Sequence, residues 1–314
     1  MPDIVISEFM DEAAWREGLE GFDVLYDPRL VDRPGDLAAA VAEARALIVR
    51  NRTQVRGDLL AAARELQCVG RLGVGLDNID VDACKARGIA VYPATGANDV
   101  SVAEYVIAAA MMLLRGAYLA SGEVIAGQWP RGRLMGREMS GKRLGLVGFG
   151  AIAKETAKRA AALGMTVAAF DPFVPENDAA WSPPWGRVER QELPDLLAMS
   201  DVVSLHVPLT ADTRNMIDAA ALESMKADAI LVNAARGGVV DEAALAAALK
   251  AGRLGGAALD VFEEEPLSAE RGRRFEGCPN LILTPHIAGV TVESNARVSW
   301  VTVEAVRKHL SRGR

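Results

Sequence analysis

Residues 142–171 constrain the fold of this chain more than any other part of the sequence. A short apolar run at 144–147 leads into a turn, Gly-Phe-Gly-Ala-Ile-Ala at 148–153, and a helical run and a second apolar run follow. A short apolar run bounded by turn residues is typical of a buried parallel strand. Strand, glycine-rich turn, helix, strand and terminal acid stand here in the order of a dinucleotide-binding βαβ unit.

Each position of the turn has its own task in such a unit. Gly148 allows a sharp turn, and Gly150 lets the backbone approach a pyrophosphate without a Cβ in the way. Ala151 and Ile152 begin a helix whose N–H groups and positive dipole end point at the phosphates. Asp171 lies 23 residues after Gly148, where a carboxylate accepts hydrogen bonds from the adenosine ribose and repels the extra phosphate of NADP. Glycine-rich turns also occur in ordinary βα connections, but the complete series favours NAD binding.

Short β-rich runs alternate with amphipathic helical runs along most of the 314 residues, a length that suits two domains. This alternation predicts an α/β fold with two doubly wound parallel sheets. A break at 93–98 is followed by a long helix over about 100–120, and a C-terminal helix at 292–310 is expected to pack back on the first domain. The other expected elements are strands at 4–6, 23–26, 46–49, 68–72 and 89–92, helices at 13–20, 36–43, 56–66 and 81–87, later strands near 144–147, 166–170, 202–206, 229–233, 256–259 and 281–284, and a loop at 181–186.

The charge and the cysteines exclude several classes of protein. A net charge of −7 gives no general footprint for nucleic acid. Cys68, Cys84 and Cys278 show neither pairing nor metal-ligand spacing, which predicts reduced thiols, no metal site and a cytoplasmic protein. The N-terminus lacks the pattern of a signal peptide, and the most apolar stretch, 102–114, contains Glu104 and is too short to cross a bilayer.

Three polar side chains in the second half each follow an apolar run, where ligands of an open α/β sheet bind. They are Arg236, Glu265 and His286. Taken one at a time, they fit a surface arginine, a solvated acid and a structural histidine. Taken together, they fit hydride transfer at a carbon next to a carboxylate. A carboxylate beside an imidazole favours its protonated form for proton exchange, and an arginine fork can hold the substrate carboxylate.

Three motifs around these residues resemble the signature series of the D-isomer-specific 2-hydroxyacid dehydrogenases. They are Arg-Gly-Gly-Val-Val-Asp-Glu-Ala-Ala-Leu from residue 236, Gly-Ala-Ala-Leu-Asp-Val-Phe-Glu-Glu-Glu-Pro from 256, and Thr-Pro-His-Ile-Ala-Gly from 284. The resemblance covers nearly the whole chain. It implies that Arg236, Glu265 and His286 form a catalytic triad.

The same resemblance implies the domain pattern and further cofactor contacts. A flavodoxin-like substrate domain would comprise residues 1–98 and 288–314, with a Rossmann NAD domain inserted at 99–287. Family members are usually homodimers that pair through the cofactor domain and an arm like the irregular segment 127–139, although a plain surface loop fits that segment as well. Beyond the glycine turn and Asp171, the resemblance places on the cofactor His206, Val207, Pro208, Thr213, Ala234, Asp260, Ala288 and Gly289.

Arginines point to the class of substrate. Within the family, the segments around Arg50, Arg71 and Arg131 look most like 3-phosphoglycerate dehydrogenase, in which matching positions gather positive charge around the substrate's phosphate. In a chain of net charge −7, several arginines directed at one site favour a second anion on the substrate, at C3. Two acids fit, 3-phosphoglycerate and (S)-3-sulfolactate, which share a carbon skeleton and a tetrahedral anion.

Other interpretations stay open at this point. Val74 and Gly75 lie in a loop that resembles the family's carboxylate-binding loop, an anion nest, but the loop also fits a tight βα turn. Each arginine alone fits a surface salt bridge, in which case glyoxylate, hydroxypyruvate or pyruvate would be the substrate. An NAD-sensing corepressor shares such a fold and triad, though such proteins usually carry terminal extensions. Formate dehydrogenase, another relative, has glutamine where Glu265 stands, which argues against that activity.

Overall fold

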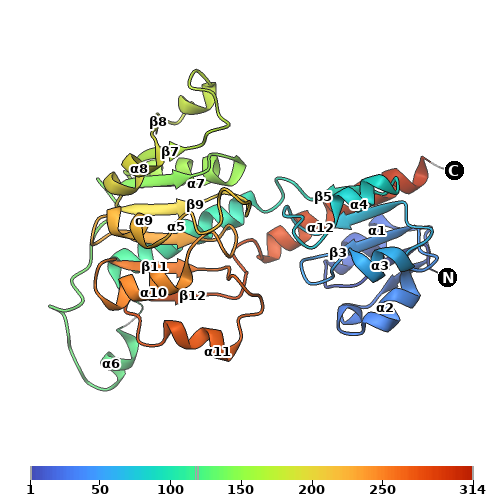
Figure 1. The fold of residues 1–314 in the computed structure, drawn as a ribbon, viewed down its shortest axis with the longest axis horizontal. Helices are drawn as coiled ribbons and strands as arrows, with labels where there is room; N and C mark the ends of the chain where they lie inside the picture. The colour runs from blue at the N-terminus through green and yellow to red at the C-terminus, as the bar shows by residue number, and fades with distance from the viewer. Residues whose placement is uncertain (1, 117, 119, 313–314) are drawn as a thin grey trace. The chain divides into compact units, whose positions relative to one another are not determined.

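The computed structural model describes residues 2–116, 118 and 120–312 of the chain. The chain divides into two compact units, unit 1 with Met1–Asn98 and Val290–Arg314, and unit 2 with Asp99–Gly289 (Figure 1). The first division falls where the sequence suggested it. The second lies after Gly289, two residues beyond the expected position at 287.

Unit 1 is built on a five-stranded sheet in which every paired strand is parallel. The strand order β2-β1-β3-β4-β5 is that of flavodoxin-like folds. The strands are β1 (Ile4–Ile6), β2 (Val24–Tyr26), β3 (Ala46–Val49), β4 (Cys68–Arg71) and β5 (Ala90–Pro93), and the helices are α1 (Glu12–Gly18), η1 (Leu30–Asp32), α2 (Pro34–Val41), α3 (Gly57–Ala62), α4 (Val81–Ala86) and α12 (Val292–Ser311).

The strands β1 and β3 of this sheet are apolar throughout because both of their faces are covered. Ile4 and Ile6 enter one hydrophobic cluster, whereas Val5 between them enters another on the opposite face. Leu47 and Ile48 divide in the same way. Successive side chains of a strand point to opposite faces, so a sheet between two helical layers needs a continuous apolar run.

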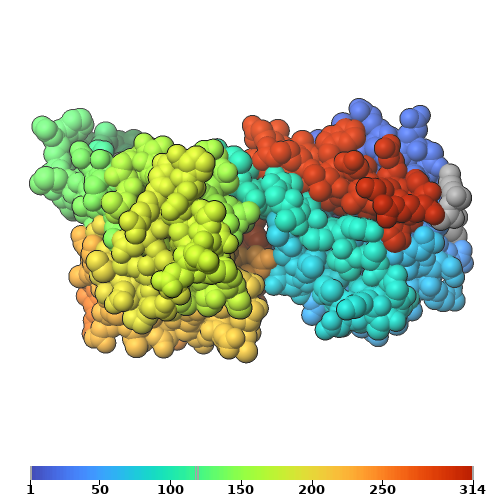
Figure 2. All heavy atoms as spheres, turned by 90° about the horizontal axis from the view of Figure 1, so that it is seen from above, coloured from blue at the N-terminus to red at the C-terminus, as the bar shows by residue number. Residues whose placement is uncertain are grey.

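The C-terminal helix α12 closes the core of unit 1, as the sequence predicted. Val298, Val303, Val306 and Leu310 are buried in the same cluster as Ile4 of the first strand. In Figure 2 the helix, drawn red, lies directly on the blue and cyan N-terminal segments. The two ends of the described chain therefore share one hydrophobic core.

Unit 2 is built on a seven-stranded sheet whose paired strands are again all parallel. Its order, β12-β11-β10-β9-β6-β7-β8, contains the Rossmann arrangement, with the order reversing between β9 and β6. The fold class predicted from the sequence is thus confirmed. The elements are α5 (Asp99–Arg115), α6 (Ser121–Ile125), β6 (Arg143–Val147), α7 (Ala151–Ala162), β7 (Thr166–Phe170), η3 (Ala179–Trp181), β8 (Val188–Arg190), α8 (Leu193–Met199), β9 (Val202–Leu205), α9 (Ala219–Ser224), β10 (Ile230–Asn233), α10 (Glu242–Lys250), β11 (Gly256–Leu259), α11 (Ala269–Gly272), η4 (Arg273–Phe275) and β12 (Leu281–Leu283).

Two local features of unit 2 differ from what the sequence predicted. Strand β8 was not predicted, because this edge strand has only three residues and only Val188 of them is buried. Helix α5 ends at Arg115 and not near 120. Gly116 follows with φ +58°, a left-handed conformation that commonly ends a helix, and α6 is a separate element. Residues 117 and 119 lie outside the described part of the chain.

None of the helices in the described ranges combines the length and the apolar character that a bilayer-spanning segment requires.

Candidate functional site

The residues expected to contact a dinucleotide all follow the carboxyl ends of strands in unit 2. Because these strands are parallel, their carboxyl ends meet at one edge of the sheet. The residues after each strand are Gly148, Gly150, Ala151 and Ile152 after β6, Asp171 after β7, His206, Val207, Pro208 and Thr213 after β9, Ala234 after β10, Asp260 after β11, and Ala288 and Gly289 after β12.

The glycine-rich turn packs closely against one neighbouring strand and is open elsewhere. Gly148 has φ +90°, and a Cβ on it would lie 2.6 Å from the backbone oxygen of His206. A Cβ on Gly150 would meet nothing within 4 Å. Gly150 is the N-cap of α7, and no side chain caps this end of the helix. The first N–H groups of this helix are thus without a side-chain cap, an arrangement that fits a phosphate group.

Asp171 is fixed beside this turn. One carboxylate oxygen accepts a hydrogen bond from the N–H of Phe149 at 2.8 Å, and the other accepts one from Phe173 at 2.9 Å. The Phe149 ring in turn stacks on Trp181, with ring centroids 5.0 Å apart and planes inclined by 11°. A carboxylate has about four lone-pair positions, so Asp171 retains acceptor capacity for ribose hydroxyls. The turn and the acid together fit a dinucleotide.

The segment after β9 is ordered by its own hydrogen bonds. His206 shares a hydrogen bond of 3.0 Å between its Nε2 and the hydroxyl of Ser204. Burial lowers the pKa of His206 to about 4, so its ring is neutral near neutral pH. The Thr213 hydroxyl donates to the backbone oxygen of Pro208 at 2.6 Å.

Glu265 and His286 form the central contact at this edge. Nδ1 of His286 and Oε2 of Glu265 are 2.7 Å apart, and the other oxygen of Glu265 accepts from the N–H of Phe262 at 3.1 Å. Burial raises the pKa of Glu265. This effect is outweighed by the hydrogen bond and charge of His286, by the Phe262 N–H and by the charge of Arg236, so the pKa lies below its ordinary value. Since Nδ1 is engaged, Nε2 is the ring nitrogen directed to a ligand.

The backbone of His286 adopts φ +57°, a left-handed conformation that is costly for a residue with a Cβ. Asp260 stabilises this segment. Its backbone oxygen accepts from the N–H of His286 at 2.8 Å, and its carboxylate accepts from Ile287 at 2.8 Å and Ala288 at 2.7 Å. Burial raises the pKa of Asp260, against the hydrogen bonds that lower it. The carboxylate expected to face the cofactor is thus bonded to its own chain.

A hydroxyl chain leads from Asp260 into helix α5. The Thr284 hydroxyl donates to the Asp260 carboxylate at 2.6 Å, and it lies 2.5 Å from the hydroxyl oxygen of Tyr105. Burial raises the pKa of Tyr105 to about 12, so the phenol stays protonated across the usable pH range. Tyr105 was not predicted as a site residue, because a tyrosine in a mostly apolar helix is usually a core residue.

Arg236 lies on the turn after β10 and faces the same edge. Asn233 holds this turn, because its side chain donates to the backbone oxygen of Arg236 at 2.9 Å and accepts from Ala235 at 3.1 Å. The charge of Arg236 contributes to lowering the pKa of Glu265. Arg236, Glu265 and His286 follow β10, β11 and β12, which are neighbours in the sheet, and the structure places Glu265 and His286 in direct contact.

Two of the other predicted arginines lie on neighbouring strands of unit 1. Arg50 directly follows β3, is 8% exposed, and donates to the side chain of Asn295 at 2.5 Å. Its guanidinium lies 3.9 Å from the Phe9 ring centroid, and its buried Nε has no partner among the described residues. Burial lowers the pKa of Arg50 to about 10, although the Glu8 carboxylate counteracts this. Arg71 at the end of β4 is also buried and donates to the backbone oxygen of Leu72 at 2.9 Å.

The loop that follows Arg50 is held by one buried carboxylate. Glu8 accepts hydrogen bonds from the N–H groups of Arg50 at 2.9 Å, Arg52 at 3.1 Å and Thr53 at 3.0 Å. Val74 and Gly75 are half-buried in the loop after β4, the neighbouring strand.

The third predicted arginine, Arg131, lies in unit 2. It is exposed in the segment that follows α6, where it lines a cavity of about 270 Å³ with Val124, Trp129 and Leu134. In the part of the chain that the structure describes, no group of three or more His, Cys, Asp or Glu side chains is arranged to hold a metal ion.

Comparison with known proteins agrees with this geometry. The family model described as D-isomer specific 2-hydroxyacid dehydrogenase, NAD binding domain, matches residues 107–288. The (S)-sulfolactate dehydrogenase of Chromohalobacter salexigens is 58% identical over 311 residues, 99% of both chains. A D-3-phosphoglycerate dehydrogenase of Archaeoglobus fulgidus is 42% identical over 86% of this chain and 50% of its own length. The solved structure of D-lactate dehydrogenase from Aquifex aeolicus with NAD and lactic acid gives a TM-score of 0.84 at 28% identity, covering 99% of this chain and 95% of that one.

Proposed function

This chain belongs to the D-isomer-specific 2-hydroxyacid dehydrogenase family, and we propose that its reaction is the NAD-dependent interconversion of (S)-3-sulfolactate and 3-sulfopyruvate. One observation carries this choice within the family. The similarity to a sulfolactate dehydrogenase is 58% and runs through 99% of both chains, whereas the phosphoglycerate dehydrogenase is less similar and matched over only half its length.

The buried environment of Arg50 supports a sulfonate over a phosphate. The guanidinium is removed from water, one of its nitrogens has no partner among the described residues, and the buried Glu8 carboxylate partly offsets its charge. A sulfonate carries one negative charge, whereas a phosphate monoester carries nearly two at neutral pH. Desolvating the second charge costs more, so a half-compensated arginine favours the monoanion. In this proposal Arg50, Arg71 and Arg131 bind the sulfonate.

The triad residues then have distinct tasks. Bound NADH supplies the hydride that C2 of 3-sulfopyruvate receives. His286 donates the proton from Nε2 to the C2 oxygen, so the carbonyl becomes a hydroxyl, and it accepts that proton in the reverse direction. Glu265 favours the protonated imidazole through the contact with Nδ1. Arg236 holds the substrate carboxylate with its two-pronged guanidinium, and the N–H groups of Val74 and Gly75 bind the same group.

The proposed cofactor contacts follow from the geometry of the sheet edge. Gly148, Gly150, Ala151 and Ile152 would hold the pyrophosphate and Asp171 the adenosine ribose, which favours NAD over NADP. The segments after the other strands would contribute the contacts to the adenine and nicotinamide ends.

We also propose a cytoplasmic homodimer that pairs through the arm after α6. The supporting observation is that Trp129 and Met135 of this arm, with Ile125 at the end of α6, are among the most exposed large apolar side chains of the described chain. Apolar side chains gathered in an irregular segment favour burial against another protein surface.

The test is an NADH-oxidation assay with 3-sulfopyruvate, 3-phosphohydroxypyruvate, hydroxypyruvate, glyoxylate and pyruvate side by side. We expect 3-sulfopyruvate to exceed the acids without a C3 anion by about 10² or more in kcat/KM. A phosphohydroxypyruvate rate higher by that margin would replace sulfolactate with 3-phosphoglycerate. Similar rates for all five would remove the C3-anion site and indicate a broad glyoxylate and hydroxypyruvate reductase.

A matched pair of variants tests whether Arg50 binds the sulfonate. Arg50→Met should bring kcat/KM for 3-sulfopyruvate within about tenfold of that for pyruvate, because the buried fork is lost. Arg52→Met, two residues away, removes an exposed arginine whose ion-pair partner is Asp32, and it should preserve the preference.

A further inference from the structure

The loop that carries Glu265 contacts both the turn that carries Arg236 and the helix α10 that follows this turn. A Cβ on Gly237 would lie 1.7 Å from the backbone oxygen of Phe262, so only glycine allows this approach. Five residues after Gly237, the side chain of Glu242 accepts a hydrogen bond of 2.6 Å from the N–H of Glu263. The two segments are therefore held in one register beside β10 and β11.

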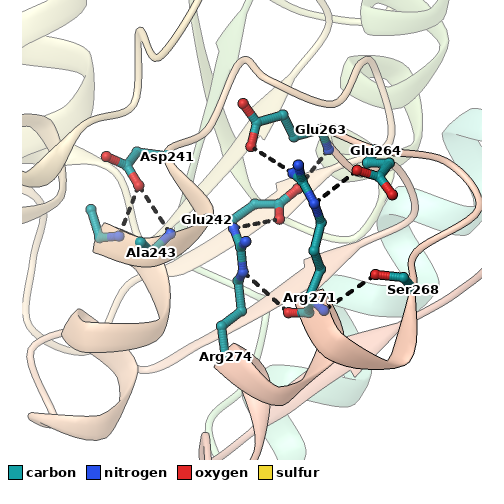
Figure 3. Close-up of polar contacts among 9 residues, drawn as sticks. Asp241, Glu242, Ala243, Glu263, Glu264, Ser268, Arg271 and Arg274 are labelled. Carbon is teal, nitrogen blue, oxygen red and sulfur yellow. Dashed lines mark hydrogen bonds and ion pairs between the residues drawn. The ribbon is translucent and has the colours of Figure 1, made fainter.

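Glu242 is an unusual residue for such a contact. It is only 5% exposed although it carries a carboxylate at the first position of α10. Its second oxygen accepts from Nη1 of Arg274 at 3.2 Å, and Nε of Arg274 donates to the backbone oxygen of Arg271 at 3.1 Å (Figure 3). Both oxygens thus have partners, as a buried carboxylate requires.

Arg271 lies three residues before Arg274 and also forms ion pairs with the loop that carries Glu265. It pairs with Glu263 at 3.5 Å and with Glu264 at 2.8 Å, as Figure 3 shows, but its side chain is 39% exposed. Exposed ion pairs of this kind contribute little to stability. Of these side-chain contacts with the loop, the buried bond of Glu242 to the backbone is therefore the one that contributes most to its position.

We propose that Glu242 is a positioning residue that, through Glu263, holds Glu265 against His286 and in register with Arg236. The inference rests on the proposed function for the roles of these three residues. The other charged group facing the pair is Asp260, which is bonded to the backbone beyond His286. Asp260 directly follows β11 and its carboxylate is bonded to Thr284, Ile287 and Ala288, so we expect a change at Glu242 to leave these hydrogen bonds in place.

The experiment compares four variants in the full-length protein. Glu242→Leu removes both hydrogen bonds, and Glu242→Gln keeps an acceptor for the Glu263 N–H. Arg274→Met removes the partly exposed ion partner, and Arg271→Met is the matched control on the exposed side. Each is measured by NADH binding, by amide hydrogen exchange over residues 260–268, and by the pH profile of 3-sulfopyruvate reduction.

Glu242→Leu should raise hydrogen exchange over 260–268 by at least about tenfold, because the bond that orders the loop is lost. Its kcat/KM should fall by about tenfold or more, since a small displacement of the pair is sufficient. The alkaline limb of its pH profile should move toward acid, because Glu265 no longer favours the protonated imidazole. Glu242→Gln should recover most of the wild-type profile, and Arg271→Met should match wild type in all three measurements.

An unchanged pH profile and unchanged exchange in Glu242→Leu would overturn the inference, as would an equal effect of Arg271→Met. If Glu242→Leu fails to bind NADH, Arg274→Met provides the comparison, with a smaller shift in the same direction expected and no shift counting against the inference. A wild-type protein that reduces none of the five acids would contradict the proposed function, and the exchange measurement would still decide whether Glu242 holds the loop.

Discussion

The loops that carry Glu265 and His286 face each other across one contact, yet they are held by different means. The segment of His286 depends on a single neighbour, Asp260, whose carboxylate accepts two backbone N–H groups and the Thr284 hydroxyl. The loop of Glu265 is held from outside, by the close approach of Gly237 and by Glu242 of α10. One loop is thus supported by its own strand end and the other by a neighbouring element. The difference predicts that kcat/KM depends steeply on one supporting residue near His286. Near Glu265 the dependence should be spread over several supporting contacts.

The largest expected effect is that of Asp260→Asn. Both carboxylate oxygens accept hydrogen bonds, so an amide nitrogen at either position would face a donor and leave it unpaired. The left-handed backbone at His286 would lose its support, and we expect kcat/KM to fall by about 10²-fold or more. Asp241→Asn is the control, because Asp241 also accepts two N–H groups, as the N-cap of α10, where Asn serves equally well. Equal losses of kcat/KM in Asp260→Asn and Asp241→Asn would contradict a special role of Asp260 in holding the His286 segment.

A smaller effect is expected for Glu265→Gln, which leaves both loops in place. The amide still accepts a hydrogen bond but carries no charge, so the protonated imidazole is less favoured and the alkaline limb of 2-oxo acid reduction should move to lower pH. At alkaline pH we expect a loss of about tenfold in rate, decreasing as the pH falls. The measurement is the rate of NADH oxidation from pH 5 to 9. An unchanged profile would remove Glu265 from the proposed pair.

Tyr105→Phe should lower kcat/KM still less, and it tests whether Asp260 is the main support of the His286 segment. The change removes the hydroxyl at the end of the chain to Thr284 but leaves the Thr284–Asp260 bond intact. We expect kcat/KM to fall by a few-fold, on the order of one lost neutral hydrogen bond. The control is Tyr118→Phe, since Tyr118 donates to Asn280 and not to this network. A loss as large as that of Asp260→Asn would mean that the support is not concentrated at Asp260.

The smallest expected effect concerns stability. The pKa of Glu265 lies below its ordinary value of 4.5 in the folded protein, so its ionised form stabilises the fold above the pKa of the unfolded chain. That contribution disappears as the pH falls through the lowered pKa. The Tm of wild type should therefore exceed that of Glu265→Gln at pH 7, and the difference should disappear as the pH falls through the lowered pKa of Glu265. A difference that grows toward acid pH would contradict the assigned direction.

The sequence alone predicted those parts of the site that depend on the order of strands, turns and helices along the chain. Parallel strands place their carboxyl ends together, so Arg236, Glu265 and His286 could be grouped from their positions after apolar runs. The glycine turn and Asp171 follow from the βαβ order in the same way. The short edge strand β8 escaped detection because two of its three residues are exposed and polar.

The supports of the site could not be predicted in this way. Glu242 and Glu263 are 21 residues apart, and Tyr105 and Thr284 are 179 apart, so their contacts depend on how helices pack on the sheet. Glu242 is an acid in the first turn of a helix, and such residues are normally exposed. The burial of Arg50 could not be predicted either, because its guanidinium is enclosed by Phe9 and Asn295, which come from distant parts of the chain.

The discontinuity of unit 1 has a consequence for biosynthesis. A ribosome releases unit 2 as one uninterrupted stretch, so its sheet can be completed while translation continues. The five strands of unit 1 emerge earlier, but one face of their sheet is only partly covered, by the α1 segment, until α12 supplies Val298, Val303, Val306 and Leu310. The N-terminal strands are thus made first and finish folding last, and in that interval their apolar surface is the part of the nascent chain that a chaperone would bind.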